Sequence, residues 1–135
     1  MFIHLKRGEK LYVNGAVLRV DRRTSLEFLN DVSFLLENHV MQAEDATSPV
    51  KQLYFIVQSM LMDPASTEMS IELYKHLSHR TRAASEDEAM RQKIDLADRK
   101  VNERRFFDAL KHLRSCFSNE PQPAGEQPAQ EEEAA

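Results

Sequence analysis

The sequence has little of what several protein classes require. One cysteine, Cys116, stands among 135 residues, so no internal disulfide can form, as is usual in a reducing compartment. Trp is absent and Gly occurs three times, which argues against collagen-like and glycine-rich classes. No glycine opens a predicted helix, so no phosphate-binding loop and no nucleotide hydrolysis are expected. The longest apolar run, residues 53–57, is far shorter than the roughly 20 residues of a membrane helix.

What is present fits a single domain of ordinary size. Apolar residues make up 41% of the chain and charged residues 30%, proportions typical of a soluble protein with one core. The N-terminal residues show no apolar signal-peptide segment. We therefore expect one cytoplasmic domain over residues 1–117.

The formal net charge of −4 is the sum over four segments that alternate between net positive and net negative charge. Residues 1–23 carry six basic and two acidic side chains, and residues 24–74 carry one basic and eight acidic. Residues 75–117 carry eleven basic and seven acidic, whereas residues 118–135 carry five acidic and none basic. The basic first block is an electrostatic footprint for an anionic partner. The last block has no large apolar residue, so we expect residues 118–135 to form a disordered acidic tail.

The first 23 residues have the alternating pattern of a β-unit. Asn14-Gly15 between two alternating runs predicts a β-hairpin, because a type I′ turn requires positive φ at both central residues. This hairpin pairs Lys10 with Arg19 and places both on one face with Tyr12 and Val17. We expect the opposite face to lie on a core; it consists of Leu11, Val13, Ala16, Leu18 and Val20.

From residue 24 onward the apolar spacing changes to the period of helices. A capping-box pattern at residues 24–27 predicts a helix from residue 24 to about residue 40. Ser48-Pro49 predicts a second helix that ends near residue 63. Further helices are predicted from about residue 67 to residue 83, from the capping box Ser85-x-x-Glu88 to about residue 101, and over about residues 106–117. The sequence thus predicts an α+β fold: a short N-terminal antiparallel β-unit (residues 1–23) followed by a four- to five-helix bundle (residues 24–117).

The basic face of the hairpin is the most informative candidate site. Like charges that face each other on paired strands are unfavourable, so Lys10 opposite Arg19 calls for a nearby anion. Tyr12 lies between them and offers a ring on which a base of single-stranded RNA can stack. In the alternative interpretation, strand twist separates the two cations in water and Tyr12 packs on a helix. The candidate RNA-binding residues are Lys6, Arg7, Lys10, Tyr12, Arg19, Arg22 and Arg23.

A second candidate surface lies in the last predicted helix. Phe106 and Phe107 are adjacent, and adjacent helix positions point about 100° apart. One narrow core does not easily take both rings. We therefore expect one of the two rings to be partly exposed and to contact a protein partner.

Signs of catalysis or metal binding are weak. Glu72, His76 and His79 share one helix face at a spacing that suits a divalent metal. A solvated face is the preferred interpretation, because no fourth ligand or supporting partner is indicated. Cys116 has no His and acid companion positioned by a motif, so a half-buried thiol is expected. We predict no catalytic residue, no metal site and no cofactor.

Five stretches of the sequence are distinctive: LKRGE (residues 5–9), VNGAVLRVDR (13–22), LLENHVMQAEDAT (35–47), QLYF (52–55) and QSMLMDP (58–64). With these stretches the chain resembles the FlbT family of flagellar-biosynthesis repressors. The resemblance covers residues 3–117 and leaves the acidic tail outside. It implies a cytoplasmic post-transcriptional regulator that binds the leader of flagellin mRNA and promotes its decay, together with a FlaF-type partner. For some members it implies contact with flagellin, and for some activation, so the sign of regulation does not transfer.

A shorter similarity concerns Lys6-Arg7-Gly8-Glu9, which is similar to the opening strand and turn of the CsrA family of mRNA-leader binders. This similarity leaves open a homodimer in which the two copies pair through a strand edge.

Two functional classes are compatible with these features. In the first, the hairpin contacts flagellin mRNA directly, and a cellular nuclease carries out the decay. In the second, the helical half binds flagellin or a flagellin chaperone, and the effect on mRNA is indirect. Binding of the purified protein to a flagellin leader in the absence of flagellin distinguishes the two classes.

Overall fold

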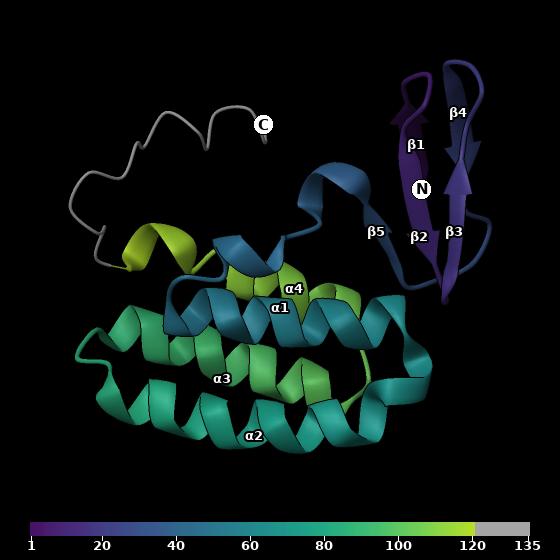
Figure 1. Cartoon of the computed structure of the whole chain (residues 1–135). Helices are drawn as coiled ribbons and strands as arrows, with labels where there is room; N and C mark the ends of the chain where they lie inside the picture. The colour runs from purple at the N-terminus through teal and green to yellow at the C-terminus, as the bar shows by residue number, and fades with distance from the viewer. Residues whose placement is uncertain (121–135) are drawn as a thin grey trace.

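The computed structural model describes residues 1–120 (Figure 1). Within this range five short strands precede four α-helices, which confirms the predicted α+β class. The description extends three residues past the expected domain boundary at residue 117, and the rest of the expected tail, residues 121–135, lies outside the described residues. The strands are β1 (Phe2–Leu5), β2 (Lys10–Val13), β3 (Ala16–Arg19), β4 (Thr24–Glu27) and β5 (Phe34–Leu36). The helices are α1 (Pro49–Met62), α2 (Thr67–Ala84), α3 (Glu88–Asn102) and α4 (Phe106–Arg114).

The predicted hairpin is present as β2 and β3. Lys10 pairs with Arg19, which confirms the predicted register. Asn14 and Gly15 have φ values of 50° and 86°, as a type I′ turn requires. A Cβ added at Gly15 would lie 3.3 Å from Cδ of Pro64, so the hairpin turn packs against the connection between α1 and α2.

The strands extend to residue 36 and not only to residue 23 as predicted, so the name β-unit now refers to residues 1–36, which contain two small sheets. One has the strand order β3-β2-β5, and the other pairs β1 with β4. The prediction that Ala16 and Leu18 face a core is wrong, because β3 is an edge strand and all four of its residues are exposed. Ile3, Leu5, Leu11 and Phe34 form the core of the β-unit, whereas Leu35 is buried against the helical core.

The predicted helix from residue 24 to about residue 40 is wrong. Residues 24–27 form β4, which pairs with β1, and residues 34–36 form β5, in which Leu35 pairs with Tyr12 of β2. The apolar residues at positions 26, 28, 32, 34 and 36 fit the alternation of a strand as well as they fit the period of a helix. Pairing provides hydrogen-bond partners for the backbones of β1 and β2, which a helix here would have left open. Thr24 Oγ1 donates to the Arg22 carbonyl at 2.7 Å instead of capping a helix.

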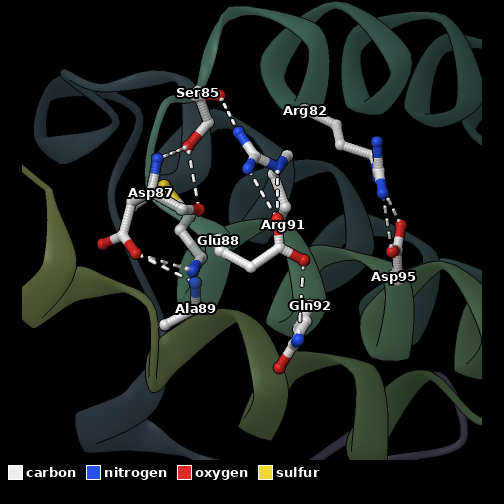
Figure 2. Close-up of polar contacts among 9 residues, drawn as sticks. Arg82, Ser85, Asp87, Glu88, Ala89, Arg91, Gln92 and Asp95 are labelled. Atoms are coloured by element: carbon white, nitrogen blue, oxygen red, sulfur yellow. Dashed lines mark hydrogen bonds and ion pairs between the residues drawn. The ribbon is translucent and has the colours of Figure 1, made fainter.

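The start of α1 is confirmed and that of α3 is corrected. Ser48 caps α1 by accepting the Lys51 N–H at 3.2 Å. In α3 the N-cap is Asp87 rather than Ser85, and its carboxylate accepts the N–H groups of the first turn (Figure 2). Ser85 Oγ instead accepts the Asp87 N–H at 3.3 Å. The helix therefore starts two residues later than predicted and has a simple N-cap instead of the predicted capping box, because the Asp87 carboxylate reaches the free N–H groups directly.

The main core lies among the four helices, and α1 ties the segment after β5 to it. Gln58 is buried in α1. It accepts the Met41 N–H at 2.6 Å and donates to the Met41 carbonyl at 2.8 Å. Tyr54 Oη donates to the His39 carbonyl at 2.5 Å. These three bonds fix residues 39–41 against α1. No helix within residues 1–120 has the length and apolarity to cross a membrane.

A polar cluster between α2 and α3 makes stability depend on pH. Asp98 Oδ1 accepts from Tyr74 Oη at 2.8 Å and from Ser78 Oγ at 2.6 Å. Burial raises the pKa of Asp98, outweighing these two bonds. A raised folded-state pKa stabilises the fold at low pH, and this contribution is lost as pH rises through the pKa. Asp98→Asn keeps the acceptor oxygen and removes the titrating group. We therefore expect the melting temperature of this variant minus that of wild type to increase from pH 3 to pH 7.

Asp95→Asn is the matched control for this prediction. Arg82 donates to both Asp95 oxygens, at 2.7 and 3.1 Å (Figure 2), and these bonds lower the pKa of Asp95. A lowered folded-state pKa contributes stability that is gained as pH rises. The melting temperature of Asp95→Asn minus that of wild type should therefore decrease over the same rise in pH. Equal trends for the two variants in thermal melts would contradict the assignment.

Candidate nucleic-acid interface

The strand pairing brings two basic turns together at one end of the β-unit. The β1–β2 turn contains Lys6 and Arg7, and the β3–β4 turn contains Arg22 and Arg23. Gly8 N–H, in the first turn, donates to the Val20 carbonyl at 2.8 Å and so joins the two turns. The first residue pair of the β2–β3 ladder, Lys10 with Arg19, lies next to these two turns. We call this end the basic tip; it consists of Lys6, Arg7, Lys10, Arg19, Arg22 and Arg23.

The basic tip points away from the helices. The hairpin turn at Gly15 packs against Pro64 of the helical part, and the two basic turns lie at the other end of the strands (Figure 1). Gly8 has a φ of 84° and open space where a Cβ would stand, so it allows the first turn without crowding the surface. A long polymer can therefore approach the tip without meeting the helices.

The positive charge of the basic tip is only weakly compensated. Five of its six cations are exposed, and Lys10 is half-buried. Arg22 Nε lies 3.4 Å from Asp21 Oδ1, but both side chains are more than four-fifths exposed, where such a pair contributes little. Two nearby carboxylates bind the backbone and not the ammonium groups: Glu9 Oε1 accepts the backbone N–H of Lys6 at 2.6 Å, and Glu37 Oε1 accepts the backbone N–H of Lys10 at 2.7 Å. Within residues 1–120 the other five cations of the tip form no ion pair.

Tyr12 does not belong to this exposed group. It is half-buried and packs against the helical core, and its strand neighbour Leu35 is buried. This position agrees with the alternative in which Tyr12 packs on a helix. The tip thus offers cations for phosphates without an aromatic platform for a base.

The two candidate partner residues have different environments. Phe106 is buried in the helical core. Phe107 is half-buried, contacts both cores and stacks on Phe34 with ring centroids 4.5 Å apart. It also lines a cavity of about 590 Å³ between the β-unit and the turn before α4. Of the two rings, Phe107 is the one that a partner can reach.

The remaining candidate groups are Cys116 and the three polar residues of α2. Cys116 is fully buried, not half-buried as predicted, and burial raises the pKa of its thiol to about 11, so the thiol is protonated at neutral pH. Glu72, His76 and His79 lie on the exposed face of α2. Within residues 1–120 no group of three or more His, Cys, Asp or Glu side chains is arranged to hold a metal ion.

Sequence reasoning missed the closeness of the two basic turns, because it placed residues 24–27 in a helix. The alternating positions 26, 28, 32, 34 and 36 were the available signal for two more strands. It also missed Arg114, a half-buried cation of α4 that no motif marks.

Comparisons with known proteins identify the family. A family model described as "Flagellar protein FlbT" matches residues 1–122. The chain is 45% identical over 115 residues to a protein of Allorhizobium ampelinum named "Probable flagellum biosynthesis repressor protein FlbT", covering 85% of this chain and 77% of the relative. A protein of the same name from Brucella ovis is 43% identical over 126 residues, which cover 93% of this chain and 83% of the relative. No solved structure matches. The chain therefore belongs to the FlbT family of flagellar proteins.

Proposed function

We propose that this protein is a cytoplasmic post-transcriptional regulator of flagellin expression that binds the 5′ leader of flagellin mRNA through the basic tip. The relatives are named flagellum biosynthesis repressors, which supports a regulatory role in flagellum biogenesis. The observation that carries the RNA-binding step is the convergence of two basic turns at the free end of the β-unit. Decay of the bound message is then the work of a cellular nuclease, and a FlaF-type protein acts alongside.

The chemistry of the tip favours contacts with the phosphate backbone. Arg and Lys side chains release condensed counterions when they neutralise phosphates, so binding weakens as salt rises. Each contact with a single strand contributes about 0.7 to the slope of log K against log salt. Sequence preference must come from other groups, because Tyr12 is packed against the helical core.

Lys10→Ala and Arg19→Ala test the paired cations of the tip. Each is expected to weaken binding of a flagellin leader RNA about 4-fold at ~0.15 M salt and to lower the slope by about 0.7. Stability should hold or rise slightly, because an opposed like-charge pair is relieved. Fluorescence anisotropy over a salt series measures both quantities. Wild-type affinity of the double variant at low salt would exclude the hairpin as the RNA surface.

A second candidate function is a protein-interaction module that binds flagellin or a FlaF-type partner. The cavity beside Phe107 favours it, because stacked rings of Phe34 and Phe107 form one of its walls and Leu29 at its rim is 86% exposed. Exposed apolar side chains around a cavity are typical of partner sites. The effect on mRNA would then be indirect.

A homodimer remains a proposal that the β3 edge supports. Val17 and Leu18 of this strand are 62% and 48% exposed, and no strand covers the β3 edge within residues 1–120. Open edges with apolar side chains readily add a further strand. Sedimentation analysis of Leu18→Lys against wild type tests this dimer.

A further inference from the structure

The β1–β4 pair exposes two ring side chains on the face that is turned away from the core. Burial alternates along β1: Ile3 and Leu5 are buried, whereas Phe2 and His4 are exposed. The Phe2 side chain is 61% exposed, and within residues 1–120 no other ring contacts it. An exposed ring adds little to the core, so its role depends on what surrounds it.

The surroundings of the two rings are polar. The β1–β4 register pairs Phe2 with Glu27 and His4 with Ser25, and cross-strand partners share a face. His4 Nδ1 and Ser25 Oγ form a hydrogen bond at 2.8 Å, which holds the imidazole ring. We call this surface the outer face; it consists of Phe2, His4, Ser25 and Glu27. Glu27 repels phosphates at the Phe2 end, so an RNA contact there must be made through a base.

The outer face continues into the basic tip. The last pair of the β1–β4 ladder is followed directly by Lys6 on one strand and preceded by Arg23 on the other, where the two strands meet the basic turns (Figure 1). Alternate residues of a strand are about 7 Å apart, so about 14 Å separates Phe2 from Lys6, with His4 between them. Two exposed rings thus lie in one row with a cation of the tip.

We propose that the outer face is a base-binding platform for single-stranded RNA, in which one base stacks on Phe2 and another on His4 while the basic tip holds the adjoining phosphates. This inference rests on the proposed function and adds the groups that contact bases, a role that the enclosed Tyr12 cannot take. Rings on an open sheet face commonly stack unpaired bases, and rings beside a basic surface are typical of single-strand binders. Continuity with the tip favours RNA over a protein partner or a second copy of this chain.

Phe2 variants test the stacking contact. Phe2→Ala is expected to weaken binding of a flagellin leader RNA about 10-fold, as loss of one stacked base does. The slope of log K against log salt should keep its wild-type value, because no charge is removed. Phe2→Trp keeps a ring and should retain the affinity, whereas Phe2→Leu should bind as weakly as Phe2→Ala. Anisotropy titrations over a salt series measure both quantities.

His4 and a residue on the helices complete the series. His4→Ala should weaken binding about 5-fold, and His4→Phe, which keeps a ring, should restore most of the loss. Met69→Ala is the matched control, because Met69 of α2 is 83% exposed and lies outside the β-unit; binding should not change. The side chains replaced are exposed, so thermal melts should show little change in any of these variants.

Ultraviolet crosslinking of the complex locates the contact. Mass spectrometry should find the leader RNA attached to residues 1–6, the tryptic peptide that contains both rings. Wild-type affinity of Phe2→Ala/His4→Ala, with crosslinks only elsewhere, would overturn the platform and leave the basic tip as the RNA surface. Absence of any binding by the wild-type protein would overturn the platform and the proposed function together. A change in the sedimentation of RNA-free protein on Phe2→Ala would assign the outer face to a contact between two copies and overturn the platform.

Discussion

Replacing Lys6, Arg7, Arg22 and Arg23 together with Gln is expected to weaken binding of a flagellin leader RNA by on the order of 100-fold at ~0.15 M salt. Each lost phosphate contact removes about 0.7 from the salt slope, which corresponds to about 4-fold in affinity at this salt. All four side chains are exposed, so the melting temperature should change little. A salt series of anisotropy titrations measures the effect.

A matched variant on the helices controls for net charge. Lys75, Arg80, Arg99 and Lys111 are also exposed, and their replacement with Gln removes the same charge outside the tip. RNA binding should fall much less in this variant, and its slope should stay near the wild-type value. An equal loss in both variants would show that only the overall charge matters. Loss confined to the helical variant would move the RNA surface to residues 75–114.

Phe106→Ala is expected to lower the free energy of unfolding by ~3 to 5 kcal/mol. Its ring is buried among residues of the helical core, and truncation leaves a cavity there. A domain of this kind has about 5 to 15 kcal/mol of stability in total, so the melting temperature should fall by roughly 10 to 20 °C. Urea unfolding followed by circular dichroism measures the loss.

Phe107→Ala is the neighbouring comparison. Phe107 is half-buried and stacks on Phe34 of the β-unit, so a smaller loss of about 1 to 3 kcal/mol is expected. If the cavity beside Phe107 binds flagellin or a FlaF-type partner, this variant should weaken that partner as well. Equal and large losses of stability from both variants would mean that both rings belong to the core and would remove Phe107 as a partner contact.

Local signals in the sequence predicted part of this fold correctly. The Asn14-Gly15 turn fixes the β2–β3 register because few residues adopt positive φ at both positions. Ser48 caps the start of α1, and Asp63-Pro64 ends the helix, so both ends of α1 are also set by local sequence. These features depend on neighbours in sequence, which a pattern can reveal.

The errors arose where distant segments decide the structure. Residues 24–36 fit a helical period, but β1 and β2 supplied partners for them as strands, and long-range pairing overrode local preference. The same pairing assembled the basic tip, so its six residues were named from the sequence but their common location was not. Tyr12 was assigned to the RNA face by alternation alone, and β5 and α1 enclose it instead.

The most direct test of RNA recognition is titration of a flagellin leader with the purified wild-type protein, without flagellin or a FlaF-type partner, over a salt series. The basic tip predicts saturable binding with a log-log slope near −4, because six cations contribute about 0.7 each. The slope should fall to about −1.4 when four of the six are replaced with Gln. Absence of binding at ~50 mM salt, where phosphate contacts are strong, would contradict direct RNA recognition and favour the protein-interaction module.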